Sequence, residues 1–486
     1  MLDNREPIII QGGMGAGVSG WRLARAVSET GQLGVVSGTA LDMVLARHLQ
    51  LGDPAGHMRR AMAEFPLPGV AERVLDRYFI EGGKAAGAPF QAVPPLSPQP
   101  ARERLELLVL ANFVEVYLAR EGHDGLVGVN FLEKIQLPTL PSLFGAMLAG
   151  VDYVLMGAGI PRTIPGILDS LARGNAVEAP YHVEGARPDE EYVTRFDPME
   201  FCAGQLPWLM RPKFLAIIAS ATLATMLVRK STGHVDGFVV EGPTAGGHNA
   251  PPRGHLQLNA RGEPIYGPRD VADLKVIADL GRPFWLAGSY GDPLRVVEAL
   301  EAGAAGVQVG TAFAYCRESD LDPALQRQVI ALSRTASARV KTDPLASPTG
   351  FPFKVVELAG TISEEDAYQQ RQRICDLGYL RHAYKKPDGT IGWRCPSEKV
   401  EHYVRKGGKL EDTRGRKCVC NGLMANISLA QIRPGTGAEK ALVTSGDDVA
   451  KVAQFLPAPD ADSYSAEDVV AYLLSAVETS TVTTRA

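Results

Sequence analysis

Eight short apolar runs recur along the first 335 residues of the chain, and a segment with helical spacing follows each of them. The runs are residues 7–11, 33–37, 126–132, 153–156, 214–219, 237–241, 284–287 and 306–309. Strands that are apolar throughout and alternate with helices are typical of a parallel sheet covered on both faces. Eight such units are the number in a TIM (β/α)8 barrel, so the sequence predicts an α/β fold of this type.

Two segments interrupt the alternation. Residues 41–122 carry several helical patterns around a proline-rich loop, which is more chain than one crossover needs, so we expect a large helical insertion after strand two. A second, polar insertion is expected at about 175–212. The alternation stops after residue 335. The sequence therefore predicts a barrel over 1–335 and a mainly helical C-terminal extension over 336–486, which holds four of the six cysteines.

The charge and hydropathy of the chain exclude several kinds of partner. The net charge is −5, and there is no basic excess that could neutralise a nucleic-acid backbone. The first residues are charged and lack an apolar signal core, and no weakly charged stretch has the pattern of a membrane span. We therefore expect a cytoplasmic protein that binds neither nucleic acid nor membranes.

Glycine makes up 51 of the 486 residues, and many of these glycines directly follow a predicted strand. The carboxyl ends of barrel strands hold the reacting groups, and the loops after strands seven and eight often bind phosphate. Gly288, Gly291, Gly310 and Thr311 lie in those two loops, where backbone N–H groups can hold an anion. No acidic residue follows the first glycine loop in the Rossmann arrangement. The pattern predicts a flat, phosphorylated cofactor other than a Rossmann-bound dinucleotide.

Five motifs carry a resemblance to a known family. They are Ile10-Gln11-Gly12-Gly13-Met14, Gly128-Val129-Asn130, Gly157-Ala158-Gly159, the segment from Glu241 to His248, and the segment from Val307 to Phe313. Over residues 5–335 the chain resembles the FMN-dependent barrels that include nitronate monooxygenases (2-nitropropane dioxygenases) and the flavin-type enoyl-ACP reductases. The resemblance implies FMN as the cofactor, bordered at its ring by Gly13, Met14 and Asn130. It also implies a cofactor site that contains Gly157 and Glu241, and a phosphate site made by Gly246, Gly247, Gly288, Gly291, Gly310 and Thr311.

His248 is the expected catalytic residue, because the matching histidine of the enoyl reductases lies by the flavin and supports catalysis. The chain departs from both branches of the family. No histidine follows strand four, where nitronate monooxygenases carry their base, and Thr244 stands where the reductases have glutamate. The resemblance implies an FMN-dependent oxidoreductase that reduces an activated C=C bond, such as that of an enoyl thioester, with NAD(P)H as the expected reductant. The alternative is oxidation of alkyl nitronates with O2.

A third hypothesis belongs to another class of protein. The insertion and the extension could serve as a docking platform, which would make the chain a non-catalytic accessory subunit of a fatty-acid or polyketide-type synthase. For the enzyme hypotheses the expected substrate is a small molecule or an acyl thioester, and a carrier protein stays open as a partner.

Four cysteines of the extension have no assigned role. Four thiolates could bind zinc or an iron–sulfur cluster. The four cysteines are Cys375, Cys395, Cys418 and Cys420. The Cys-x-Cys pair and the long gaps match the common ligand spacings poorly, so reduced, buried thiols are the simpler interpretation.

Overall fold

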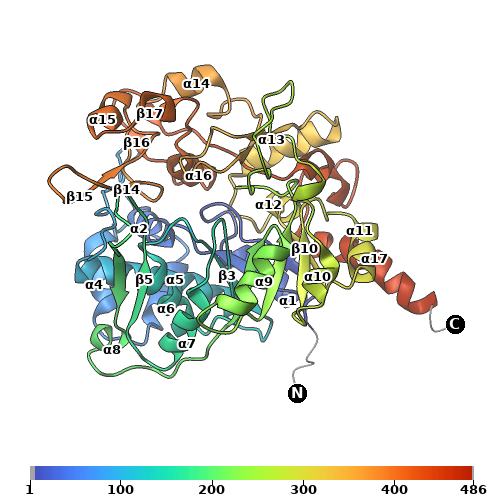
Figure 1. The fold of residues 1–486 in the computed structure, drawn as a ribbon, viewed down its shortest axis with the longest axis horizontal. Helices are drawn as coiled ribbons and strands as arrows, with labels where there is room; N and C mark the ends of the chain where they lie inside the picture. The colour runs from blue at the N-terminus through green and yellow to red at the C-terminus, as the bar shows by residue number, and fades with distance from the viewer. Residues whose placement is uncertain (1–5, 484–486) are drawn as a thin grey trace.

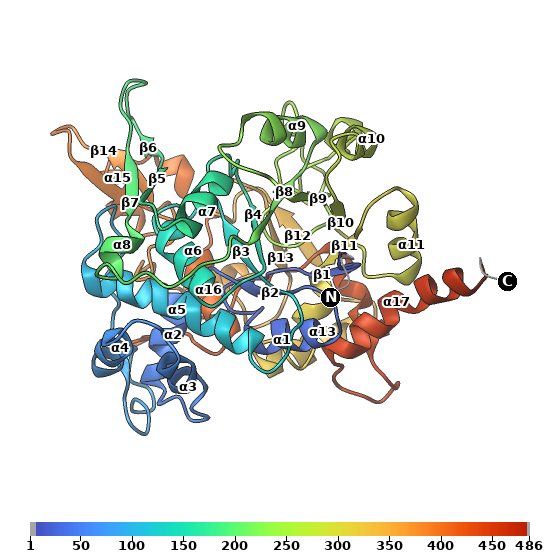
Figure 2. The same ribbon diagram turned by 90° about the horizontal axis from the view of Figure 1, so that it is seen from below.

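The computed structural model describes residues 6–483, with side chains up to Val477, and contains one eight-stranded parallel sheet in the order β1-β11-β10-β9-β8-β4-β3-β2. The strands are β1 (Ile9–Gln11), β2 (Gly34–Ser37), β3 (Val127–Leu132), β4 (Tyr153–Gly157), β8 (Lys213–Ile218), β9 (Gly237–Glu241), β10 (Phe284–Ala287) and β11 (Gly306–Val309). The first and last strands of this order meet at Leu33. Its N–H donates to Ile9 O at 3.1 Å, and its carbonyl accepts from Gln11 N–H at 2.9 Å. The strands form the ring seen in Figure 2, which confirms the predicted TIM barrel.

The inside of the ring is a packed apolar core, as expected for a barrel of this size. One cluster of buried side chains from β1, β2, β4, β8, β9 and β10 fills it, and Trp285 is its largest member. The indole N–H of Trp285 donates to Pro7 O at 2.7 Å, which satisfies the polar atom of this buried ring.

A shell of helices surrounds the sheet. Those of the alternating units are α1 (Trp21–Glu29), α6 (Thr139–Leu148), α7 (Ile164–Ala172), α9 (Ala221–Lys230), η1 (Pro268–Asp270), α10 (Leu274–Ala278), α11 (Pro293–Glu301), α12 (Thr311–Ala314) and α13 (Pro323–Arg334). Local sequence sets several of their starts. Asp292 accepts from Leu294 N–H at 2.9 Å and precedes a proline, so it caps α11.

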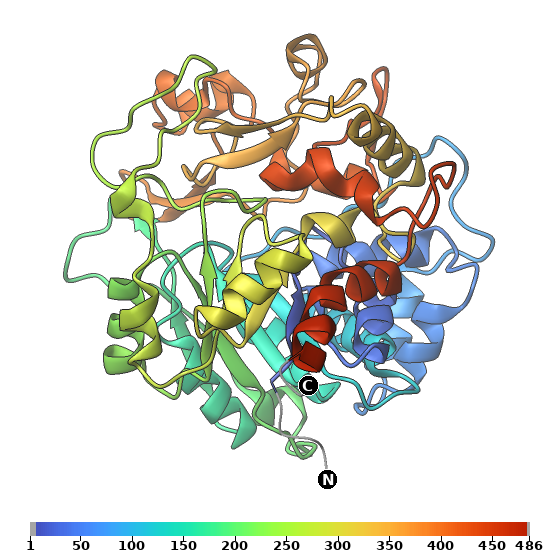
Figure 3. The same cartoon turned by 90° about the vertical axis from the view of Figure 1, so that its right-hand side faces the viewer.

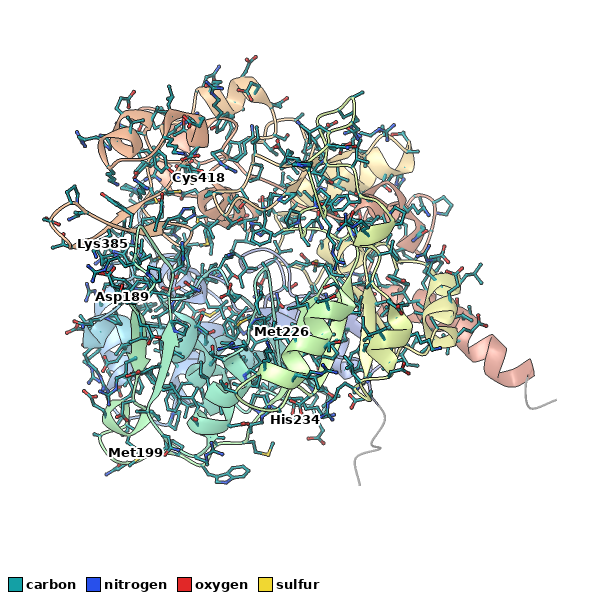
Figure 4. All side chains as sticks on the ribbon, viewed as in Figure 1. Asp189, Met199, Met226, His234, Lys385 and Cys418 are labelled. Carbon is teal, nitrogen blue, oxygen red and sulfur yellow. The ribbon has the colours of Figure 1, made fainter. Side chains whose placement is uncertain are left out.

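Four helices lie between β2 and β3, in the segment where the helical insertion was expected. They are α2 (Leu41–Gln50), α3 (His57–Ala63), α4 (Val70–Tyr78) and α5 (Arg102–Arg120). The second insertion contains the antiparallel pair β5 (Val177–Pro180) and β7 (Val193–Phe196), the strand β6 (Val183–Glu184) and the helix α8 (Pro198–Phe201). β6 pairs with a strand of the C-terminal extension. Close to this pairing, Glu190 forms an ion pair with Lys385 of the same strand. Figure 4 labels Lys385 and Asp189, the neighbour of Glu190.

The extension contains strands as well as the expected helices. Its helices are α14 (Glu365–Gln369), α15 (Val400–Arg405), η2 (Leu410–Thr413), α16 (Val419–Asn426), η3 (Asp447–Phe455) and α17 (Ala466–Thr483). Its strands form three antiparallel pairs, β12 (Val340–Asp343) with β13 (Phe353–Val356), β14 (His382–Lys385) with β15 (Ile391–Arg394), and β16 (Ile432–Arg433) with β17 (Gly437–Ala438). None of these strands is longer than four residues, which is too short for an alternating pattern to be recognised in the sequence.

Most of the extension lies over one end of the barrel. Figures 1 and 3 show its orange and brown segments on the side opposite the amino terminus, over the carboxyl ends of the strands, whereas α17 packs against α11 beside the barrel. The apolar core runs without interruption from the barrel into the extension, so the division at residue 335 stays a prediction. Among residues 6–483, no helix is both long and apolar enough to cross a membrane.

Candidate functional site

A cavity lies between the carboxyl ends of the barrel strands and the extension that covers them. Eleven of the twelve predicted site residues line it, namely Gly13, Met14, Asn130, Gly157, Glu241, Gly246, Gly247, His248, Gly288, Gly310 and Thr311. Gly291 is not among the lining residues. Its carbonyl accepts from Gln454 Nε2 at 2.7 Å, so a contact with η3 holds it behind the wall. The structure therefore brings all but one of the predicted residues together.

Three of the lining glycines stand where a side chain would not fit. A methyl group on Gly13 would overlap Asn130 Cβ, and one on Gly246 would lie 2.9 Å from Gly446 N. Gly288 has a φ of +103°, and its added Cβ would lie 2.8 Å from Thr244 Oγ1. These positions require glycine because the backbone itself forms the wall, as it does around a closely held cofactor.

Two buried amide oxygens in the cavity have no hydrogen-bond partner among the described residues. Asn130 donates through Nδ2 to Gly13 O at 3.4 Å, which leaves its Oδ1 unpaired, and Gln308 Oε1 is unpaired as well. A buried acceptor without a donor costs about 1–3 kcal/mol, so such atoms mark a place for a bound polar group. A flat cofactor with ring N–H and hydroxyl groups would supply the missing donors, and FMN has both.

Three non-glycine residues of the wall adopt the left-handed conformation. Ala40 has a φ of 60° and precedes α2. Ala158 has a φ of 53° and follows β4, and Ser289 has a φ of 56° and follows β10. Non-glycine residues rarely adopt this conformation, and backbone strain of this kind concentrates at functional sites. At Ala158 and Ser289 the strain lies in the loops that would face the ring and the phosphate of the expected cofactor.

His248 stands in the wall with its ring held from two sides. Its Nε2 lies 2.7 Å from Ser347 Oγ, and its ring packs against Phe353 with the two centroids 4.8 Å apart. Burial lowers the pKa of His248 to about 4, so the imidazole is neutral at pH 7. A neutral imidazole in this place can donate or accept a hydrogen bond, and it carries no charge.

Glu241 is the carboxyl group at the end of β9. Burial raises its pKa to about 8, and no charged partner offsets that effect, so the group is largely protonated at pH 7. A neutral carboxyl can donate a hydrogen bond inside the cavity. Asp448, at the start of η3, also lines the cavity, and burial raises its pKa too.

The sequence interpretation missed the part of the site that the extension contributes. The roof of the cavity is formed by Leu377, Tyr379, Leu380, Val419, Cys420, Leu423, Thr444, Ser445, Gly446 and Asp448. Gly446 N–H donates to Thr311 Oγ1 at 2.9 Å, and Gly247 N–H donates to Thr444 Oγ1 at 3.0 Å. The short run of small and polar residues around Gly446 was the one signal in the sequence that could have indicated it.

A second, small cavity lies beside the first. All four extension cysteines line it, and it shares Cys420 with the main cavity. Within residues 6–483, no group of three or more His, Cys, Asp or Glu side chains has an arrangement that could hold a single metal ion.

Comparison with protein families gives one match. Residues 209–345 match the nitronate monooxygenase family. The matched segment contains β8, β9, β10 and β11 and the loops that carry Glu241, His248, Gly288 and Gly310. Over this segment the match confirms the resemblance to nitronate monooxygenases that the motifs indicate. No curated protein matches the chain.

Several solved structures are similar over nearly the whole chain. FabK from Thermotoga maritima has a TM-score of 0.48 at 16% identity, covering 99% of this chain and 96% of its own. A nitroalkane oxidase from Streptomyces ansochromogenes has a TM-score of 0.44 at 17% identity, covering 99% and 98%. The enoyl reductase domain of MlnA, from the macrolactin biosynthesis cluster of Bacillus amyloliquefaciens, has a TM-score of 0.47 at 10% identity, covering 97% and 94%. These scores do not by themselves define an activity.

Proposed function

We propose that the chain is an FMN-dependent oxidoreductase that reduces an activated C=C bond, with NAD(P)H as the reductant. The cavity is the main support for FMN as the cofactor. Its glycine wall and the unpaired side-chain oxygens of Asn130 and Gln308 fit a flat, phosphorylated ligand that forms hydrogen bonds. The phosphate would lie at the loops of Gly288 and Gly310, and the ring beside Gly13 and Asn130. When bound, FMN would supply hydride chemistry, and the protein would supply position and electrostatics.

His248 would stabilise the negative charge that develops on a substrate carbonyl oxygen. Because Ser347 holds Nε2, the other ring nitrogen is the one left for the substrate. The Ser347 hydroxyl, by donating to Nε2, would fix the tautomer with its hydrogen on Nδ1. A neutral donor aimed at a developing oxyanion is worth about 10²–10³ in rate.

A neighbouring groove supports an acyl thioester as the substrate. It is lined by Lys134, Arg381 and Trp393 among others, and it adjoins the main cavity along Ile135, Tyr379 and Leu380. The two cations stand at aromatic rings, Lys134 Nζ 5.3 Å from the Phe351 centroid and the Arg381 guanidinium 5.6 Å from that of Trp393. Basic groups suit the phosphate of a thioester carrier, and the apolar residues between the two cavities suit an acyl chain.

Oxidation of alkyl nitronates with O2 is the second candidate, and the family match over residues 209–345 favours it. The loop after β4 argues against deprotonation of a nitroalkane, because Gly157, Ala158 and Gly159 offer no base there. A preformed nitronate needs no base. A non-catalytic docking subunit fits less well, since it would not need the unpaired oxygens of the cavity.

Anaerobic reduction of the purified protein distinguishes these functions. We expect a yellow protein that NADH or NADPH bleaches and that a crotonyl-type thioester reoxidises. Bleaching by alkyl nitronates alone would instead establish the monooxygenase. A colourless protein that does not take up added FMN would overturn both enzyme functions and leave the docking subunit.

A further inference from the structure

Four of the six cysteines meet in the second cavity, although they come from separate segments of the extension. Cys375 follows α14, Cys395 follows β15, and Cys418 and Cys420 lie at the start of α16, where Figure 4 labels Cys418. All four line the same small cavity, and all are free thiols. The remaining two, Cys202 and Cys316, lie elsewhere.

Among the residues whose side chains are described, the rest of the lining of this cavity carries no ionisable side chain. The other wall residues are Pro348, Leu377, Gly378, Leu380, Ser397, Val419 and Asn421. The four thiols are therefore the groups of this cavity that can ligate a metal, and four cysteine thiolates are the common ligand set of iron–sulfur clusters.

The Cys418 sulfur accepts a side-chain hydrogen bond. Asn421 Nδ2 donates to Cys418 Sγ at 3.5 Å. A neutral thiol is only a weak acceptor. An N–H donor at this sulfur fits a metal-bound thiolate, whose properties such hydrogen bonds tune.

We propose that Cys375, Cys395, Cys418 and Cys420 ligate an iron–sulfur cluster. A single zinc ion would require the sulfurs to converge at about 2.3 Å from one point. The cysteines instead surround a cavity, and no group among residues 6–483 is arranged around a single ion. A cluster holds several iron atoms and its own sulfide, so four thiolates can ligate it without converging on one point.

The cluster would lie beside the main cavity. The two cavities share four wall residues, which are Leu377, Leu380, Val419 and Cys420. Two of the three segments that would ligate the cluster, those around Cys375 and Cys420, thus also roof the main cavity, whereas the segment of Cys395 does not. The cluster would fix two chain segments, around Cys375 and around Cys420, in their position over the site.

Analysis of metal and acid-labile sulfide tests the proposal on the full chain. We expect protein purified anaerobically, or reconstituted with ferrous iron and sulfide, to hold iron and sulfide in equal amounts, about two or four of each per chain. Dithionite reduction should give an electron paramagnetic resonance signal distinct from a flavin radical. Zinc in place of iron, or the absence of both metal and sulfide after reconstitution, would overturn the cluster.

Single replacements assign the ligands. Cys375→Ser, Cys395→Ser, Cys418→Ser and Cys420→Ser should each lower the iron content at least twofold, whereas Cys202→Ser, at a buried cysteine of the second insertion, should leave it unchanged. Unchanged iron in all four variants would overturn the assignment. If the variants are insoluble, the metal and sulfide content of the unaltered chain still tests whether a cluster is present. This measurement does not depend on whether the protein binds FMN.

Discussion

The Nε2 atom of His248 lies 2.7 Å from the hydroxyl oxygen of Ser347, and this contact joins the loop after β9 to the C-terminal extension. Thr349 continues the link, with its N–H 3.2 Å and its hydroxyl 2.9 Å from the same Ser347 oxygen. His248 itself pairs with Phe353 in an isolated antiparallel bridge. The extension thus orients the ring that the proposed chemistry uses.

Replacement of His248 should separate catalysis from cofactor binding. In His248→Ala we expect reoxidation of the reduced enzyme by a thioester to slow by about 10²–10³, because an oxyanion donor is lost. Ser347→Ala should slow it by only about fivefold, since one orienting hydrogen bond of about 1 kcal/mol is removed. Rapid-mixing absorbance measures both rates, and FMN content serves as the control. Equal rates in His248→Ala and the unaltered enzyme would contradict the role of His248.

Glu241 should make stability depend on pH in the neutral range. Burial raises its pKa from 4.5 to about 8, so between these values the folded state holds a proton that the unfolded chain has lost. The free energy of unfolding should therefore fall as the pH rises from about 4.5 to about 8. Glu241→Gln should lose this component, and Glu178→Gln, at an exposed carboxyl group of β5, should keep it. Thermal unfolding from pH 5 to 9 measures the difference. Parallel curves for Glu241→Gln and the unaltered chain would exclude a raised pKa.

The barrel and most of its site were predictable because they depend on local signals. Apolar runs mark the strands, and glycines mark the loops where backbone must approach a ligand, as Gly13 and Gly288 do. The roof was not predictable, because Tyr379 and Gly446 lie in irregular segments and Cys420 lies in α16, a helix of only eight residues. These residues reach the site through contacts over hundreds of residues, such as the buried Tyr379 hydroxyl bonded to Asp42.

The same limit explains Gly291. It was grouped with the phosphate loops because it lies three residues from Gly288, yet a side chain from η3 binds its carbonyl. The sequence likewise did not indicate that the four cysteines lie around one cavity. Their spacing matches no common motif, and only the fold brings Cys375, Cys395 and the start of α16 to one cavity.

Gly13 should tolerate no side chain. In Gly13→Ala the new methyl group would overlap Asn130 Cβ, so Asn130 must move or the loop must open. We expect a loss of stability of about 1–3 kcal/mol and at least about tenfold weaker FMN binding, a change of about 1.4 kcal/mol. Gly267→Ala is the matched control, because its added Cβ would meet nothing within 4 Å and its φ is −125°. Fluorescence titration with FMN and thermal unfolding measure the two effects, and an unchanged affinity in Gly13→Ala would place the ring elsewhere.

Replacement of Ala158 by glycine should relieve backbone strain in the wall of the cavity. Its φ of 53° disfavours alanine by about 1–2 kcal/mol relative to glycine, whereas glycine adds about 0.4–1 kcal/mol of entropy to the unfolded chain. Ala158→Gly should therefore raise the free energy of unfolding by up to about 1 kcal/mol. Ala336→Gly, at an exposed residue with a φ of 51°, should give a similar gain far from the cavity. Only Ala158→Gly should also alter turnover, because Ala158 lines the cavity and its loop would face the flavin ring. A stabilised Ala336→Gly beside a destabilised Ala158→Gly would show that the Ala158 methyl group contributes packing that outweighs its strain.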